Sequence, residues 1–171
     1  MEKIARFEKV SFEEFKKTWT KQVGEFEESK IKNIYDNIKL PKRATAGSAG
    51  YDFYTPISLS LDAGSEIMLP TGIRAKFSPD YALIIAPKSG LGSKFRLQLN
   101  NTFGLIDSDY YNSDNEGHMM CKLINDGREG KTVNLDAGAG FVQGFFVKIG
   151  ITEDDDADGV RNGGFGSTAK K

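Results

Sequence analysis

The first 38 residues carry apolar side chains at the spacing of an amphipathic helix. The run Ser11-Phe12-Glu13-Glu14 matches a capping box, in which a serine and a glutamate satisfy backbone N–H groups at a helix N-terminus. A second amphipathic stretch covers residues 26–38. We therefore predict that residues 1–38 form a helical extension that packs on the rest of the domain. The apolar positions of the two helical faces are Phe12, Phe15, Trp19, Val23, Phe26, Ile31, Ile34, Tyr35 and Ile38.

Residues 39–152 follow a different pattern, in which short apolar runs alternate with polar residues. Such alternation is typical of half-buried strands, and turn signals rich in Gly, Pro, Asn and Asp separate the runs. The pattern predicts an all-β sandwich or barrel and disfavours a parallel α/β sheet, because no helical stretches alternate with the strands. The apolar positions that alternate are Ile57, Leu59 and Leu61, then Ile73, Ala75 and Phe77, then Leu97 and Leu99, then Val133 and Leu135.

The last zone, residues 153–171, has no apolar pattern that could form a core element. Its first part, Glu153–Asp158, repels itself and predicts a solvated, extended tether. The residues from Arg161 to Thr168 combine glycines, hydroxyls, a cation and Phe165. Glycines admit an anion close to backbone N–H groups, and an aromatic ring offers a stacking face. We interpret this tail as a mobile lid over a phosphorylated, ring-bearing ligand; a disordered terminus is the alternative.

Composition narrows the classes of function. The chain has 171 residues, a formal charge of −1, one histidine and one cysteine. A near-neutral charge argues against non-specific nucleic-acid binding, and the apolar stretches are too short to span a membrane. One cysteine excludes an intrachain disulfide, and one cysteine with one histidine argues against a structural zinc site. We expect a cytoplasmic protein in which Cys121 is a buried apolar filler of a strand.

Small and polar residues also occur together in four segments of the predicted β domain, and each segment alone fits an ordinary turn or loop. The segments are Ala49-Gly50-Tyr51-Asp52, Pro87–Gly92, Gly104–Tyr110 and Gly138–Gly144. The last one places the amide of Gln143 inside an apolar strand, where it must find partners. Together with the tail, the four segments form a more specific set. Lys88, Ser89 and backbone N–H groups suit phosphates, carboxylates suit a hydrated magnesium or an attacking water, and the aromatics suit a nucleoside.

The order of these five segments and the residues in them resemble those of the trimeric dUTP pyrophosphatase (dUTPase) family. The resemblance covers residues 40–168, and its most specific parts are Gly-Leu-Ile-Asp-Ser-Asp-Tyr and Gly-Gly-Phe-Gly-Ser-Thr. It implies a β jelly roll assembled as a homotrimer, with active sites shared between subunits. It also implies hydrolysis of dUTP to dUMP and pyrophosphate with Mg²⁺. The length and the N-terminal extension are similar to those of family members from Gram-positive bacteria and their phages. If the chain is phage-encoded, we expect it in the host cytoplasm.

The resemblance implies roles for the residues that would act on the triphosphate. Asp107 would be the general base that orients a water for in-line attack on the α-phosphorus, since an aspartate is already ionised at neutral pH. Asp52 and Gln143 would hold magnesium-bound waters, because Mg²⁺ keeps several waters while it bridges phosphate oxygens. The residues expected to bind the phosphates are Lys88, Ser89, Gly90, Ser167 and Thr168.

The same resemblance implies how the nucleoside would be held. The hairpin around Asn101 and Gly104 would recognise uracil through backbone donors and acceptors, so that cytosine leaves buried partners unpaired. Thymine's methyl group would collide with the close hairpin wall. Tyr110 would lie under the deoxyribose and leave no room for a 2′-hydroxyl. Phe165, followed by Gly166, would stack over the uracil when the tail closes.

Three features depart from the family pattern. Lys88 stands where the family usually has arginine, which replaces a bidentate phosphate grip with a point charge. Arg161 lies one residue nearer to the Gly-Gly-Phe-Gly run than usual, although a phosphate contact is still expected of it. The usual Arg-Gly after the tyrosine is replaced by Tyr111–Gly117, which we interpret as a surface loop and a candidate partner-binding surface. His118 is expected at a strand edge rather than in catalysis.

Two other functions compete with dUTP hydrolysis. A dCTP deaminase on a related fold would need a proton shuttle beside the base, usually glutamate, whereas the acid here is Asp107 next to Tyr110. A binding or signalling module would use nucleotide occupancy to order the tail and the Tyr111–Gly117 loop for a protein partner. Pyrophosphate release from dUTP separates the hydrolase from the deaminase, and a nucleotide-dependent partner with negligible turnover would favour the module.

Overall fold

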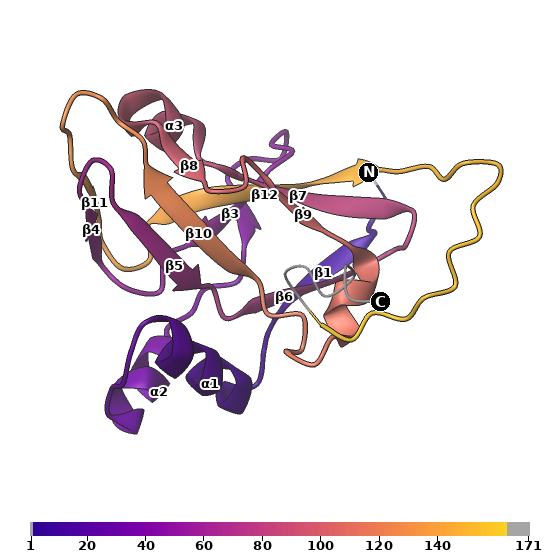
Figure 1. Cartoon of the computed structure of the whole chain (residues 1–171), viewed down its shortest axis with the longest axis horizontal. Helices are drawn as coiled ribbons and strands as arrows, with labels where there is room; N and C mark the ends of the chain where they lie inside the picture. The colour runs from indigo at the N-terminus through magenta and orange to yellow at the C-terminus, as the bar shows by residue number, and fades with distance from the viewer. Residues whose placement is uncertain (1, 164–171) are drawn as a thin grey trace.

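The structure, a computed structural model, describes residues 2–163 as antiparallel β-sheets with two helices packed below them (Figure 1). The largest sheet has the strand order β2-β3-β12-β7-β9. At Gly144 a Cβ atom would lie 2.9 Å from the Phe53 ring, so glycine leaves room for that ring against β12. The strands of this sheet are β2 (Lys42–Arg43), β3 (Tyr51–Tyr54), β12 (Gly140–Lys148), β7 (Tyr81–Pro87) and β9 (Gly104–Ile106).

Two of the three smaller sheets contain further strands that the alternating pattern predicted. Leu61, Leu97, Leu99 and Val133 are buried, as the alternation requires. The all-β prediction for this part of the chain is confirmed. The strands are β5 (Glu66–Pro70), β10 (Met120–Asn125) and β8 (Leu97–Leu99) in one sheet, and β11 (Val133–Leu135) with β4 (Leu59–Leu61) in the other.

Strand β1 (Ala5–Lys9) corrects the prediction that residues 1–38 are helical throughout. It pairs antiparallel with β6 (Ile73–Phe77). The ring of Phe7 meets those of Tyr51 and Phe53 edge-on, with centroids 5.3 and 5.5 Å away. Ladder hydrogen bonds to a distant strand and this aromatic contact outweigh any local helical preference. The N-terminus is therefore woven into the β core before its helices begin.

The two expected helices form, α1 (Phe12–Gln22) and α2 (Glu28–Asp36). Phe15 and Trp19 are fully buried on the inner face of α1, which fits the predicted aromatic stripe. Ser11 caps α1 by accepting a hydrogen bond from the Glu14 N–H at 3.1 Å. The reciprocal hydrogen bond of the capping box, from the Ser11 N–H to the Glu14 carboxylate, does not form at this helix start. The Ser11 N–H donates to the Glu116 carboxylate instead, at 2.7 Å.

A short helix, α3 (Ser89–Phe95), forms where the sequence suggested only a loop. It follows Pro87 and Lys88 directly, and its apolar residues Leu91 and Phe95 pack against the core. The segment after β9 forms a 3₁₀ helix, η1 (Ser108–Asn112). Both short helices begin at a predicted site segment, so each places its first residues at the end of a strand.

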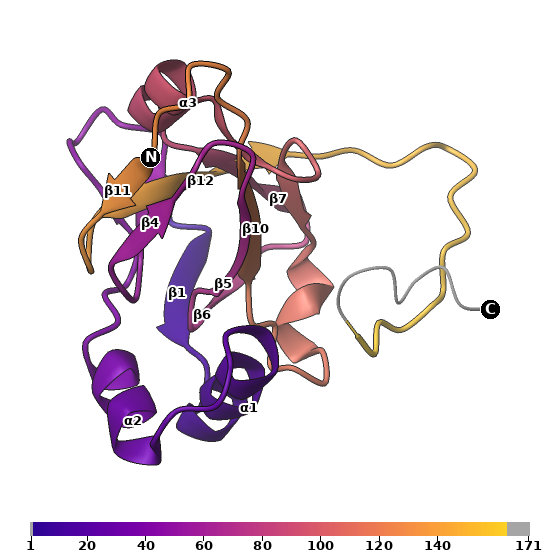
Figure 2. The same cartoon turned by 60° about the vertical axis from the view of Figure 1, so that its left-hand side comes forward.

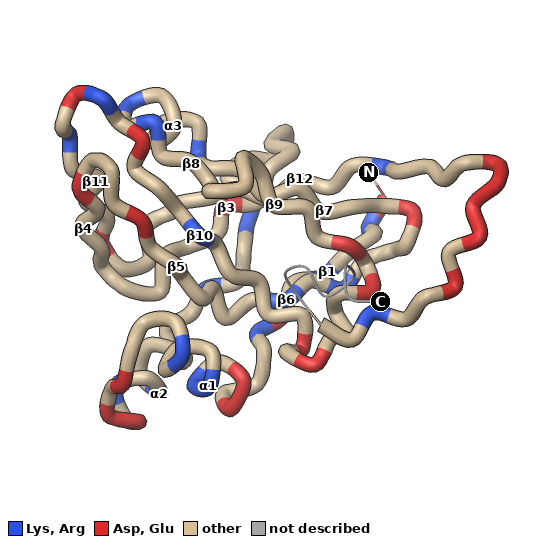
Figure 3. Tube along the Cα trace, in the orientation of Figure 1, with Lys and Arg blue, Asp and Glu red and all other residues tan. Residues whose placement is uncertain are grey.

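After β12 the chain leaves the sheets as an extended arm, which both views show (Figures 1 and 2), and it returns to η1 at Arg161. The acidic residues Glu153–Asp158 lie along the outer bend of this arm and are exposed, as the tether prediction requires (Figure 3). Lysines and arginines are spread among acidic residues over α1 and α2 in the same view. None of the described helices is long and apolar enough to cross a membrane.

Candidate functional site

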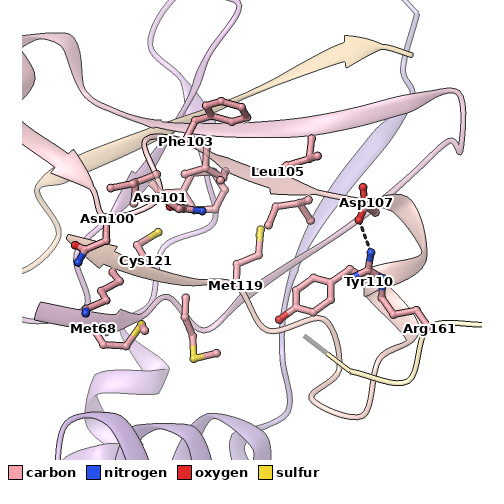
Figure 4. A pocket seen from close by; sticks show the side chains of 17 residues that line it. Met68, Asn100, Asn101, Phe103, Leu105, Asp107, Tyr110, Met119, Cys121 and Arg161 are labelled. Carbon is pink, nitrogen blue, oxygen red and sulfur yellow. Dashed lines mark hydrogen bonds and ion pairs between the residues drawn. The ribbon is translucent and has the colours of Figure 1, made fainter. Parts of the chain in front are cut away.

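A cavity of about 470 Å³ lies between the hairpin after β8, strand β9, helix η1 and strand β10 (Figure 4). Its wall is mainly apolar and includes Phe53, Ile85 and Met119. Polar groups reach it from the hairpin, from η1 and from the arm. The predicted site residues that line the cavity are Asn101, Gly104, Asp107, Tyr110 and Arg161. We call the first four the pocket group.

The hairpin at the cavity mouth is held in a strained turn. Thr102 has a φ of 73°, a left-handed backbone that a β-branched residue rarely adopts, and its N–H donates to the Leu99 carbonyl at 2.8 Å. A Cβ atom at Gly104 would lie 3.2 Å from the Ile85 Cβ, so a side chain there would crowd β7. Phe103 is half exposed beside the mouth (50%). The backbone of this hairpin therefore lies close to any group that enters the cavity.

Asp107 follows β9 directly and occupies the N-cap position of η1, where its side chain makes no capping hydrogen bond and is 46% exposed. Arg161 of the arm binds it: the guanidinium pairs with the Asp107 carboxylate and donates to Asp109 at 2.8 Å (Figure 4). The Arg161 side chain is only 17% exposed. In this structure the partners of Arg161 are thus two carboxylates. The phosphate contact expected of Arg161 stays a prediction.

Tyr110 forms a fixed part of the cavity wall. It is 6% exposed, and burial raises the pKa of its hydroxyl, so it is neutral at pH 7. The hydroxyl donates to the His118 carbonyl at 2.8 Å and accepts from the Asn115 amide at 2.8 Å. The ring is therefore held in place at its hydroxyl end.

The other described site residues lie on β3 and β12 and at the junction of β7 with α3, and we call them the sheet group. Asp52 on β3 lies directly beside Gln143 on β12 in the strand register. The Lys88 ammonium donates to the Asp52 carboxylate at 2.8 Å, so the expected phosphate ligand and the expected magnesium-water ligand pair with each other. None of the sheet group lines the cavity of the pocket group. Its members are Asp52, Lys88, Ser89, Gly90 and Gln143.

Other residues singled out in the sequence lie outside both groups. The predicted tail residues Phe165, Gly166, Ser167 and Thr168 are outside the described residues. Cys121 is buried in β10 and burial raises the pKa of its thiol to about 12, which confirms it as an apolar filler. His118 adjoins β10 but is fully buried (0% exposed), rather than at an open edge.

Sequence reasoning missed Asn115 and His118 as neighbours of Tyr110. The only signal in the sequence was the insertion that carries Asn115, because both contacts to the hydroxyl come from the chain just after it.

A family model described as dUTPase matches residues 36–169. The chain belongs to the dUTPase family. A curated deoxyuridine 5'-triphosphate nucleotidohydrolase of Lactococcus lactis is 38% identical over 143 residues, which are 82% of this chain and 93% of that protein. The counterpart of Glaesserella parasuis is 37% identical over 148 residues, with the same two coverages.

Solved dUTPases have the same fold. A dUTPase from Streptococcus mutans aligns with a TM-score of 0.59 and 37% identity, over 67% of this chain and 88% of that one. A dUTPase of Staphylococcus bacteriophage 80alpha, solved with dUPNHPP, aligns with a TM-score of 0.58 and 20% identity, over 77% and 92%. The jelly-roll prediction and the predicted family are confirmed. The dUTPase match begins at residue 36, so β1, α1 and most of α2 lie outside it.

Proposed function

We propose that dUTP binds with its uracil in the cavity of the pocket group, its deoxyribose on Tyr110 and its α-phosphate beside Asp107. The chain is a dUTP diphosphatase by its family: water and dUTP give dUMP and pyrophosphate. The observation that carries this placement is that one cavity collects Asn101, Gly104, Asp107 and Tyr110. The cavity offers an apolar wall for a base and a carboxylate at its end.

Base selection would come from the hairpin. Its backbone is fixed by the strained turn at Thr102, so its free donors and acceptors cannot adjust to a different pattern on the base. Cytosine in place of uracil would leave buried groups without partners, a loss of about 1–3 kcal/mol for each. A thymine methyl group would meet the hairpin where Gly104 already lies against Ile85.

Asp107 would act as the base of the hydrolysis. Its carboxylate accepts a hydrogen bond from a water, and the water oxygen attacks the α-phosphorus in line with the bridging oxygen of the leaving group. The new bond is between water oxygen and phosphorus, the bond to the bridging oxygen breaks, and pyrophosphate leaves. Asp107 takes the proton that the water gives up.

Arg161 must leave Asp107 before this can happen. The guanidinium, itself largely covered, now pairs with the half-exposed carboxylates of Asp107 and Asp109. A triphosphate carries more negative charge than either carboxylate, and two of its oxygens can accept a bidentate pair of hydrogen bonds from arginine. Substrate would therefore draw Arg161 onto phosphate and free Asp107 for the water. This exchange agrees with the phosphate contact expected of Arg161.

Mg²⁺ fits the donors that the chain offers only as a mostly hydrated ion. Within residues 2–163 no group of three or more His, Cys, Asp or Glu side chains could hold a metal. Asp52 and Gln143 supply one carboxylate and one amide side by side, which suits contact through waters. Bound there, the ion would neutralise phosphate charge. Asp52 would contribute after Lys88 exchanges it for a phosphate oxygen.

A homotrimer would bring the two groups together. The pocket group and the sheet group do not share a cavity within one chain, although both match the family's site segments. We propose that the sheet group of one protomer completes the cavity of its neighbour, with a tail reaching over both. The exposed apolar side chains Phe103 and Leu105 beside the cavity mouth would be covered by this contact.

A protein partner on the Tyr111–Gly117 loop is the second candidate role. Phage 80alpha dUTPases are described as controlling transfer of virulence genes, and that chain shares 20% identity with this one. Within the loop only Asn112 and Asp114 are exposed. A partner would therefore have to recognise a small polar surface here.

Pyrophosphate release tests the proposed function. The purified protein is incubated with Mg²⁺ and each deoxynucleoside triphosphate in turn, and with dUTP plus excess EDTA. We expect release from dUTP alone, and its loss in EDTA. Comparable turnover of dCTP or dTTP would contradict the base selection, and ammonia release from dCTP would indicate a deaminase.

A further inference from the structure

The loop after Tyr110 folds inward and holds the tyrosine hydroxyl on two sides. The Asn115 Nδ2 donates to this hydroxyl at 2.8 Å, and the hydroxyl donates to the His118 carbonyl at 2.8 Å. The other end of the Asn115 amide accepts from the Gly117 N–H at 3.2 Å. The Asn115 carbonyl accepts from the His118 N–H at 3.0 Å. Asn115 is thus fixed by its own loop with an N–H aimed at the tyrosine.

The loop can pass this close to Tyr110 only because of its backbone. Glu116 and Gly117 both have left-handed φ angles, 57° and 71°. A Cβ atom at Gly117 would lie 2.7 Å from the Tyr110 carbonyl oxygen and 2.8 Å from the Tyr111 Cα. Such a backbone persists only where its surroundings hold it. The turn is therefore built against the tyrosine that it supports.

The outer side of the loop is fastened to the N-terminal segment. The Glu116 carboxylate accepts from the backbone N–H of Ser11 at 2.7 Å and also from its hydroxyl. The Tyr111 hydroxyl donates to Glu8 of β1 at 2.6 Å, and the Arg74 guanidinium lies 4.4 Å from the Tyr111 ring centre. The hydrogen bonds from Ser11 to Glu116 and from Tyr111 to Glu8 each join the insertion to a residue that lies before the family match.

The end of the loop also lies against α1. The buried His118 accepts from the Gly72 N–H through Nε2 at 2.9 Å, which places the proton of a neutral ring on Nδ1. That nitrogen faces the Glu14 carboxylate at 3.9 Å. Glu14 also accepts from the Thr18 hydroxyl at 2.7 Å. The carbonyl that accepts the Tyr110 hydrogen bond therefore belongs to a residue that is buried beside α1 and held by the Gly72 N–H.

We infer that Asn115 is a positioning residue that sets the discrimination between dUTP and UTP by fixing the Tyr110 ring. The inference rests on the proposed placement of the deoxyribose on Tyr110. A ring held at its hydroxyl by two partners cannot shift to make room for a 2′-hydroxyl. With the Asn115 N–H removed, one partner remains and the ring gains the freedom to move. UTP then becomes a better substrate, while dUTP, which needs no extra room, changes little.

The test compares kcat and KM for dUTP and UTP in Asn115→Leu and in Asp114→Ala, an exposed control on the same loop. We expect the ratio of kcat/KM for dUTP to that for UTP to fall about tenfold in Asn115→Leu, the size expected for one lost buried hydrogen-bond partner. The gain should lie in the KM for UTP. Asp114→Ala should keep the wild-type ratio. An unchanged ratio in Asn115→Leu, with or without a lower Tm, would overturn the inference.

A double-mutant cycle shows whether Asn115 acts through the hydroxyl. Tyr110→Phe keeps the ring and removes the hydroxyl, so adding Asn115→Leu to it should change the ratio no further. Additive effects would overturn the inference. If Asn115→Leu does not fold, Asn115→Asp serves instead, since it keeps the acceptor for Gly117 and lacks the N–H.

Tyr110→Leu separates this inference from the proposed function. If removing the ring leaves the ratio unchanged while dUTP is still hydrolysed, the placement of the deoxyribose is wrong and the inference fails with it. If Tyr110→Leu lowers the ratio and Asn115→Leu does not, only the positioning role fails.

Discussion

The pocket group and the sheet group differ in how far the single chain prepares them for a ligand. In the pocket group the hairpin is held in a strained turn at Thr102, and Tyr110 is fixed at its hydroxyl. In the sheet group Lys88 and Asp52 form an ion pair with each other. The cavity proposed for the nucleoside is thus preformed, whereas the residues proposed for the triphosphate need a ligand or a neighbour to separate their ion pair. Base selection and the proposed general base share the pocket group, whereas the residues expected to bind the triphosphate and Mg²⁺ lie mainly in the sheet group.

Asp107→Asn should give the largest effect, because Asp107 is the member of the pocket group assigned to chemistry. The amide keeps the size of the side chain but loses the charge that orients the water, so we expect kcat to fall by ~10²–10⁴-fold. Asp109→Asn is the matched control, since Asp109 binds the same arginine. Steady-state kinetics and dUTP binding check both. A near-normal kcat in Asp107→Asn would place the base elsewhere.

Ending the chain before Arg161 should weaken both groups' hold on substrate without unfolding the protein. The lost ion pairs of Arg161 lie at the surface and contribute little stability, so Tm should barely change. Loss of a base–aromatic contact of ~1–3 kcal/mol alone lowers kcat/KM by about 5- to 150-fold. Phe165→Ala should reproduce part of this loss. Full activity in the truncated protein would favour the disordered-terminus interpretation.

Mixing two inactive variants tests whether the groups meet across protomers. Asp107→Asn damages the pocket group and Lys88→Ala the sheet group. If each site takes one group from each of two neighbours, co-refolded trimers should regain roughly a quarter of wild-type sites. Separately refolded proteins, mixed afterwards without exchange, are the control. No recovery in verified mixed trimers would mean that each chain completes its own site.

The sequence predicted the β core and the pocket group because both depend on local signals. Alternation placed Leu97 and Leu99 in a strand, and the segment Gly104–Tyr110 carried its own motif. Strand β1 was missed because its only large apolar side chain is Phe7, and its stability comes from a partner strand far along the chain. The helix after Lys88 was missed because its glycines disfavour a helix locally.

Contacts between distant residues limited the prediction of the site. Asp52 and Lys88 were assigned to different ligands, whereas the fold pairs them across 36 positions of sequence. The acceptor for the Ser11 N–H was expected three residues away and lies 105 residues away, at Glu116. Side chains that meet only after folding leave no periodic signal, so the support of Tyr110 by the insertion could not be read from spacing.

Substitution of Glu14 on α1 should have the smallest effect on activity. It tests whether α1 stabilises the pocket group and not the sheet group. Its carboxylate faces His118 and has its pKa lowered from 4.5 to about 2, with the His118 contact as the largest cause. Because the folded pKa is depressed, Glu14 stabilises the fold above pH 4.5, and this contribution is lost as the pH falls toward 2. Its upper limit is roughly 3 kcal/mol.

Glu14→Gln should therefore lower the free energy of unfolding at pH 7 and close the gap to wild type near pH 2, with the exposed Glu13→Gln as control. At pH 7, kcat for dUTP should stay within about twofold, because Glu14 acts on folding rather than on the reacting atoms. Urea unfolding across the pH range measures the gap, and amide exchange shows where it arises. Protection should fall at Tyr110 and His118 while Gln143 in β12 keeps it. Equal loss in both places would mean that α1 supports the whole β core, and that the two groups do not differ in their dependence on the N-terminal segment.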